Sequence, residues 1–406
     1  MTGAVSPLVL TVPAALAMAL LWLAAWRRFG GRFTLMATAA VLAFFFIKEF
    51  MNVRGLLLGH HYKVNHAFFQ LLDVSPTVVL GHCFTLFAGL LAGDRVVARA
   101  GLAPRASYYM VSVAAAATAT AWIMETIGIA GGWWAWQKTG APFETSYAAI
   151  DHVFIVAPPA AIAGWPLYMG IFLAMFAGCL WIAGDRAGGR LAWIAVPLPF
   201  VALFPLWRDE PMSVPVHACT TLALLALCAW SLGAALGRRR AWLGIFPVAL
   251  LEALNWSEMR GGVVMPVAVI AAYAAAALLP AFEIAPQFRP RAFQAPWLDA
   301  VARRGLEASL AIFFAVIVYV LARAGGDPRM WANVLPAAGA ALLALAPVPA
   351  LPCAAACAIA AGALFALRVP YLGVAILFVA LLVAAWGATV RLGAIGARLK
   401  EAKNAS

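Results

Sequence analysis

Charged residues are scarce in this sequence: Asp, Glu, Lys and Arg make up only 11% of its 406 residues. An average soluble domain carries about 25% charged residues. Hydrophobic residues make up 65% of the chain, and its mean hydropathy is +0.93. This composition excludes a water-soluble fold and intrinsic disorder alike. The sequence therefore predicts an all-α protein, a polytopic bundle of transmembrane helices.

Motifs for cofactors and metals are also lacking. The six cysteines fall inside apolar stretches without a CxxC pair, and there is no glycine-rich nucleotide or flavin loop. His60, His61 and His66 have no carboxylate or cysteine nearby at metal-ligand spacing. A haem held between two helices would need two histidines at the same depth in the membrane, and only His82 and His217 could provide them. We therefore predict no cofactor and no metal.

The net charge of +12 does not indicate nucleic-acid binding, because the basic residues lie between apolar stretches instead of forming one stripe. Of the 28 basic residues, 19 fall in one set of alternate connections, beginning with Arg27 and Arg28. The other nine, including Lys48, fall in the opposite set. The positive-inside rule then predicts an outer N-terminus and a cytoplasmic C-terminus. Because Arg27 and Arg28 follow the first apolar stretch, that stretch is predicted to be a retained helix rather than a signal peptide.

The sequence contains about thirteen candidate membrane spans. The sixth, eighth and eleventh are short, and region 331–390 can also be divided in other ways. An odd number agrees with termini on opposite sides of the membrane. The predicted spans are 6–26, 33–50, 74–92, 108–129, 156–184, 191–206, 214–235, 241–254, 263–280, 305–323, 331–346, 349–367 and 371–390.

The chain is predicted to have three parts: a nine-helix core in 1–287, a cytoplasmic linker in 288–304 and a four-helix, alanine-rich tail in 305–406. Small residues let helices approach closely, so the tail is a candidate scaffold or homo-oligomer contact. The Ala-, Gly- and Arg-rich composition suggests a GC-rich genome, and we expect the chain in a bacterial cytoplasmic (inner) membrane.

Three predicted hairpins repeat an acid near the outward end of a span. Glu49, Glu125 and Glu252 are each followed three residues later by Asn or Gly, and then by a returning helix. Such repeats surround sites in transporters and in membrane enzymes. Glu125 is the most informative acid, because its apolar neighbours favour the protonated carboxyl that a general acid needs. A structural carboxyl bonded to a neighbouring helix is the alternative.

Further polar candidates lie at the starts of the fifth and seventh spans. Asp151 is a secondary acid, and His152 or His217 could act as a base or orient another group. Adjacent helix residues point about 100° apart, so Asp151 and His152 are expected to serve different neighbours. Tryptophans beside the acids could stabilise a carbocation, although an interfacial belt also explains them. The candidate substrate-binding residues are Trp133, Trp134, Trp136, Trp256, Arg208 and Arg260.

The segment METIGIAGGWWAW (124–136), followed by AIDHVFIVAPPAAIAGWPLYMG (149–170), resembles integral-membrane carotenoid-modifying proteins. These are the bacterioruberin-type carotenoid hydratases and, more distantly, the heterodimer-type lycopene cyclases. Asp151 and His152 occupy about the place in the sequence where the cyclases carry a pair of carboxylates. His152 departs from that pattern, because it is not a carboxylate. The families share an acid near a helix end, a glycine, an aromatic-x-aromatic pair and a proline-containing helix, at the places here of Glu125, Gly128, Trp134, Trp136 and Pro158.

The resemblance implies a cofactor-independent membrane enzyme of carotenoid or isoprenoid biosynthesis, of the lyase or cyclase kind. Its substrate would be a polyene or another membrane lipid, and Glu125 would protonate a double bond before hydration or cyclisation.

Two other classes of protein fit the same residues. A proton-coupled transporter or lipid carrier would use the intramembrane acids for coupling, and a non-catalytic scaffold subunit would need none of them.

Overall fold

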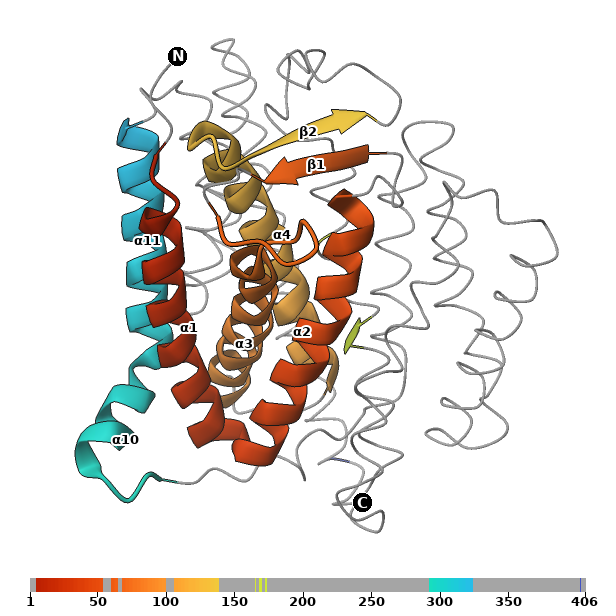
Figure 1. Cartoon of the computed structure of the whole chain (residues 1–406). Coiled ribbons are helices and arrows are strands. Elements are labelled where there is room, and N and C mark those ends of the chain that lie inside the picture. Colours follow the sequence, from red (N-terminus) through yellow and green to blue (C-terminus); the bar gives the residue numbers. More distant parts are fainter. Residues whose placement is uncertain are drawn as a thin grey trace, which may run out of the picture.

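The described part of the chain is mostly helical (Figure 1). The computed structural model describes residues 5–53, 60–64, 68–99, 106–138 and 292–323, together with Trp165, Tyr168, Met169, Phe172, Leu173 and Ala402.

Five long helices occupy these ranges, and each corresponds to a predicted span. Four of them, α1, α2, α3 and α11, are long and apolar enough to cross a membrane, and α4 contains a shorter apolar stretch, Ala115–Ala130. The chain is therefore a multi-pass membrane protein. The other predicted spans lie wholly or mostly outside the described residues. The helices are α1 (Leu8–Phe29), α2 (Gly31–Val53), α3 (Pro76–Arg99), α4 (Ala106–Ala130) and α11 (Gly305–Arg323).

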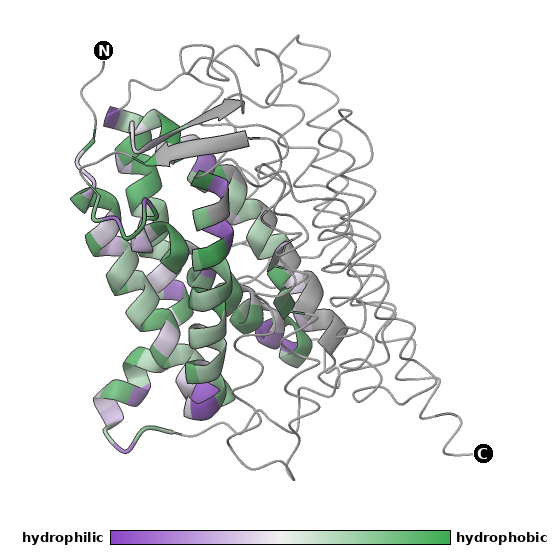
Figure 2. Cartoon of the chain, turned by 45° about the vertical axis from the view of Figure 1, so that its right-hand side comes forward, coloured by the Kyte–Doolittle hydropathy of each residue, from purple (hydrophilic) through white to green (hydrophobic). Residues whose placement is uncertain are grey.

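Exposed apolar side chains form one face of α1, as expected of a helix in contact with lipid. Leu8, Val12 and Leu16 follow one another at four-residue intervals and are 66%, 62% and 54% exposed. Residues at this spacing share one helix face. Figure 2 shows hydrophobic residues along most of the length of the described helices, as a bilayer requires.

The helices run alternately up and down, which gives the bundle two distinct ends (Figure 1). At the first, which we name the basic end, α1 and α3 finish while α2, α4 and α11 begin. Gly30 alone joins α1 to α2, and its φ of 90° is a conformation that glycine adopts without strain. The arginines that close α1 and α3 lie at the basic end, which is the end predicted to face the cytoplasm.

Ion pairs join the helices at the basic end. Both oxygens of Asp94 on α3 accept hydrogen bonds from Arg28 on α1, and the Tyr109 hydroxyl on α4 donates to Asp94 over 2.9 Å. Arg95 on α3 pairs with Glu307 on α11 at 2.6 Å. Bidentate arginine–carboxylate pairs fix orientation as well as distance. Four helices are thus held in register at one end.

A short helix, α10 (Pro296–Arg303), is tied to the same end by its carboxylate Asp299. Asp299 is 3% exposed and accepts hydrogen bonds from Arg27 and Arg303, each over 2.7 Å. The bond from Arg27 first, then the bond from Arg303, lowers the pKa of Asp299 to about 2. The backbone N–H of Phe293 also donates to this carboxylate.

Acid is expected to release α10. The pKa of Asp299 in the folded protein lies below the unfolded value of about 4, so the stabilisation is complete above about pH 4 and is lost as the pH falls towards 2. We expect wild type to have a higher melting temperature than Asp299→Asn in detergent at pH 6. This difference in melting temperature should shrink below pH 4. A difference that stays constant down to pH 2.5 would contradict this role of Asp299.

Helix α11 packs directly against α1, although the two are far apart in sequence (Figure 1). Gly305 leaves no room for a Cβ beside the carbonyl of Leu20, and the Ser309 hydroxyl donates to Ala17 O over 2.8 Å. A small residue at a helix contact permits this close approach. The first helix of the predicted tail therefore shares a core with the first helix of the chain.

The opposite end, which we name the sheet end, carries two short strands. β1 (His60–Val64) pairs antiparallel with β2 (Trp134–Lys138), with His60 opposite Lys138 and Val64 opposite Trp134. The sequence does not predict these strands, because neither segment shows the alternation of apolar and polar residues typical of a half-buried strand.

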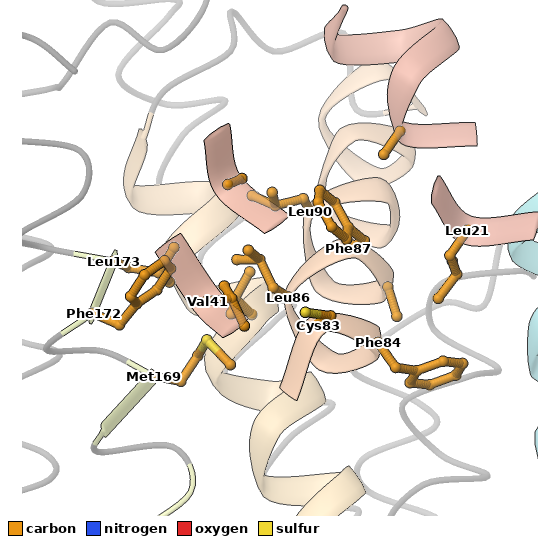
Figure 3. Close-up of a cluster of buried hydrophobic side chains, with 14 of the residues drawn as sticks. Leu21, Val41, Cys83, Phe84, Leu86, Phe87, Leu90, Met169, Phe172 and Leu173 are labelled. Atoms are coloured by element: carbon orange, nitrogen blue, oxygen red, sulfur yellow. The ribbon is translucent and has the colours of Figure 1, made fainter. Parts of the chain in front are cut away.

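The core between α2 and α3 is built from aliphatic and aromatic side chains (Figure 3). Val41 from α2 and Leu86 from α3 meet Phe172 there, and all three are fully or almost fully buried. This packing holds α2 against α3, and the charged side chains described below lie between the same two helices.

Candidate functional site

A cluster of three ionisable side chains lies buried between α2 and α3. One carboxylate oxygen of Glu49, Oε1, accepts from Lys48 Nζ at 2.7 Å and from His82 Nε2 at 2.8 Å. Lys48, Glu49 and His82 are 4%, 2% and 0% exposed. Charged side chains at such positions are costly and mark functional sites by default.

Local geometry explains how these residues meet. Lys48 and Glu49 are consecutive on α2 and leave the helix about 100° apart, but the long lysine stem lets its ammonium reach the neighbouring carboxylate. His82 lies near the start of α3, at the depth of Glu49 near the end of the antiparallel α2. The cluster therefore sits towards the sheet end of the bundle.

Aromatic rings enclose this cluster. Phe45, one turn before Glu49, stacks on the His82 imidazole with centroids 3.9 Å apart, and Trp165 lies 4.2 Å from the same imidazole. The Lys48 ammonium is 5.9 Å from the Trp165 ring and 5.6 Å from the Tyr168 ring. Aromatic faces at these distances stabilise a cation. The rings also fix the histidine plane.

The hydrogen bonds assign the proton on His82. An ionised Glu49 can only accept, so Nε2 carries the hydrogen that it donates to Oε1. In a neutral imidazole the other nitrogen, Nδ1, then has a lone pair. Nδ1 is buried and has no hydrogen-bond partner within the described ranges of the chain.

The second polar position is Glu125 on α4. It is 4% exposed, and the indole N–H of Trp134 donates to its Oε2 over 3.1 Å. The neighbouring indole N–H, of Trp133, donates instead to the carbonyl of Val5 over 2.8 Å. The two tryptophans that follow α4 thus have different partners, and only Trp134 reaches the acid among the bonds described here.

Gly128 makes the contact between Trp134 and Glu125 possible. A Cβ at Gly128 would overlap the indole of Trp134, which lies across α4 at this point. The helix also ends here, since the backbone N–H of Trp133 donates to Gly128 O over 2.7 Å. Glycine at this position therefore allows the ring to fold back over α4 towards the carboxyl group.

Gly128→Ala is expected to displace the indole and destabilise the protein by about 1–3 kcal/mol, because the Trp134–Glu125 bond is lost. The same change in a Trp134→Ala background should be neutral or stabilising, since alanine favours a helix over glycine by about 1 kcal/mol. Melting of the four proteins in detergent completes the double-mutant cycle. If Gly128→Ala lowers the stability equally in both backgrounds, the Trp134 ring does not lie against Gly128.

The two polar positions lie at neighbouring depths. Gly89 of α3 abuts Val113 of α4, and Gly93 abuts Tyr109, which sets the antiparallel register of these helices. The same register of α3 and α4 places Glu125 about five residues, or ~7 Å of helix rise, closer to the sheet end than His82. Trp165, which packs on His82, belongs to the same buried cluster as Met124 and Ile127 beside Glu125.

The structure locates some of the predicted site residues. Glu49 is buried on α2 and Glu125 on α4, Trp133 and Trp134 follow α4, and Trp136 takes its place in β2. The other predicted residues lie outside the described ranges: Glu252, Asp151, His152, His217, Trp256, Arg208 and Arg260.

Two members of the cluster, Lys48 and His82, and the enclosing Trp165 were not predicted as site residues. Lys48 was assigned to an outer connection, which is wrong, because it is 4% exposed within α2 and paired with Glu49. His82 had been considered only as a haem ligand. The signal that could have found both is their charge or polarity inside an apolar span.

No group of three or more His, Cys, Asp or Glu side chains is arranged to hold a metal within the described residues. The strand β1 contains His60 and His61, which follow one another along the backbone. The prediction of a site without metal or cofactor stays a prediction.

Comparisons with protein-family models, with curated proteins and with solved structures give no match for this chain.

Proposed function

We propose that this chain is an integral membrane enzyme that protonates a double bond of an isoprenoid or carotenoid lipid, leading to hydration or cyclisation. The observation that carries the proposal is a set of buried groups able to exchange protons, enclosed by aromatic rings within lipid-spanning helices. We also propose that it lies in a bacterial cytoplasmic membrane with its sheet end outside.

Glu125 is the proton donor in this proposal. A protonated carboxyl can accept the indole N–H of Trp134 through its carbonyl oxygen and still give its own proton to a substrate carbon. That proton forms a new C–H bond with the electron pair of the double bond and leaves a carbocation on the adjacent carbon. A dry, aromatic site stabilises this cation through the ring faces.

Two outcomes follow from the same carbocation. In hydration, a water oxygen bonds to the cationic carbon and loses one proton to a base, so the product gains one water. In cyclisation, a second double bond of the substrate attacks the cation, and loss of a C–H proton restores a double bond, so the mass is unchanged. Neither reaction needs an oxidant or a reductant.

Expression in a bacterium that accumulates an acyclic carotenoid tests the proposal. Chromatography and mass spectrometry of the extracted pigments should show a product heavier by one water, or an isomer with a shifted absorption spectrum. Unchanged pigment, in cells where the protein is inserted and melts cooperatively after extraction, would overturn the proposal.

A proton-coupled transporter or lipid carrier is the second candidate, favoured by the ion pair of Lys48 and Glu49 inside a membrane span. Protein reconstituted in vesicles would then accumulate its cargo when a pH gradient is imposed, and a Glu49→Gln variant would exchange cargo without accumulating it. A scaffold subunit, in contrast, would tolerate neutralisation of Glu49, Glu125 and Glu252 together.

A further inference from the structure

The imidazole of His82 is held in one orientation. Its Nε2 is bonded to Glu49, while the Phe45 and Trp165 rings pack on it at 3.9 and 4.2 Å between centroids. Rotation of the ring would break the bond to Glu49 and disrupt the stacking. A histidine fixed by a carboxylate at one nitrogen presents its other nitrogen at a defined position.

The other nitrogen, Nδ1, is an acceptor without a partner in the part of the chain that the structure describes. His82 is 0% exposed, and Nδ1 has no hydrogen-bond partner among the residues that the structure describes. Buried polar atoms are paired in the great majority of cases, and an unpaired one calls for an explanation. The bond at Nε2 leaves the lone pair at Nδ1 available to a hydrogen-bond donor.

A second buried polar atom lies near the start of α3. The hydroxyl oxygen of Ser75 is buried and likewise lacks a partner within the described ranges. Ser75 precedes α3 at the sheet end, seven positions before His82, so the two residues lie on one face about 10 Å apart along the helix. Water is the ligand that pairs such buried atoms.

We infer that His82 is the proton acceptor of the proposed reaction and acts through Nδ1. This inference rests on the proposed function. In hydration, the water oxygen bonds to the carbocation while one of its protons passes to Nδ1. In cyclisation, Nδ1 takes the C–H proton, and the electron pair of that bond forms the new double bond. The imidazolium then gives its proton to water, and Glu125 regains a proton from water.

Lys48 and Glu49 position and tune this base. Glu49 keeps the hydrogen on Nε2 and stabilises the imidazolium when it forms, whereas the nearby Lys48 ammonium disfavours that cation and promotes release of the proton. His82 is therefore a base that returns to its neutral form, as repeated turnover requires. Glu49 is a positioning residue that acts through His82.

Nitrogen-15 NMR of the protein labelled at histidine, in lipid nanodiscs, tests the assigned tautomer without any substrate. His82→Gln identifies the signal, since the other five of the six histidines remain. We expect a protonated Nε2 and an unprotonated Nδ1 in His82, and a rise in the Nδ1–H tautomer in Glu49→Gln. A protonated Nδ1 in wild type would overturn the inference.

His82→Gln also tests the chemistry. Glutamine can place an N–H near the position of Nε2 and keep the bond to Glu49, but it has no acceptor at the position of Nδ1. We expect kcat to fall at least about 100-fold with KM and melting temperature little changed. Full activity in this variant would overturn the inference. Absence of product from wild type would instead overturn the proposed function, and the NMR spectrum would then decide the state of Nδ1 by itself.

Discussion

Glu49→Leu is expected to destabilise the protein by about 3–5 kcal/mol, because Lys48 then stays buried without its carboxylate. The same change removes the bond that orients His82, so product formation should be lost as well. Thermal melting in detergent and pigment analysis measure the two effects separately.

The double variant Lys48→Met/Glu49→Leu is the matched control. Replacing both members of a buried ion pair by apolar side chains of similar size is often neutral or stabilising. We expect the double variant to regain most of the melting temperature but none of the activity. If Glu49→Leu melts like wild type, the ion pair is not buried as described; if the double variant is active, Glu49 does not serve the reaction.

Glu125→Gln is expected to reduce product formation by about 10²–10⁴-fold, the usual contribution of a general acid. Glutamine keeps the size of the side chain and an oxygen that accepts from Trp134, so folding should be preserved. Glu307→Gln is the control, since Glu307 lies at the basic end and its side chain is 45% exposed. Unchanged activity in Glu125→Gln would remove this residue from the mechanism.

The helices of the described bundle follow closely from the sequence. The predicted span 305–323 coincides with α11 (Gly305–Arg323), and 33–50 falls within α2 (Gly31–Val53). The arginines that close α1 and α3 gather at one end, as the alternation of basic connections predicts. Long apolar runs bounded by arginines carry this information locally, whereas β1 and β2 pair across about 70 residues and leave no local pattern.

The site was predictable only in part. Glu125 and Glu49 are recognisable as acids near the ends of apolar spans, because each is conspicuous in its own segment. Their partners are not, since Glu49 meets His82 across 33 residues of chain and Trp165 arrives from a third segment. Lys48 misleads for a related reason: a count of basic residues treats every lysine near a span end as a loop residue, and this one turns inward.

The fate of the transferred proton tests acid catalysis most directly. Purified protein in lipid vesicles that contain an acyclic polyene would be incubated in D₂O, and the product examined by mass spectrometry after its exchangeable hydrogens are washed out. Protonation by Glu125 predicts one carbon-bound deuterium in the product, whether it is hydrated or cyclised, and little product of either kind from Glu125→Gln. A wild-type product with no carbon-bound deuterium would contradict acid catalysis at this site.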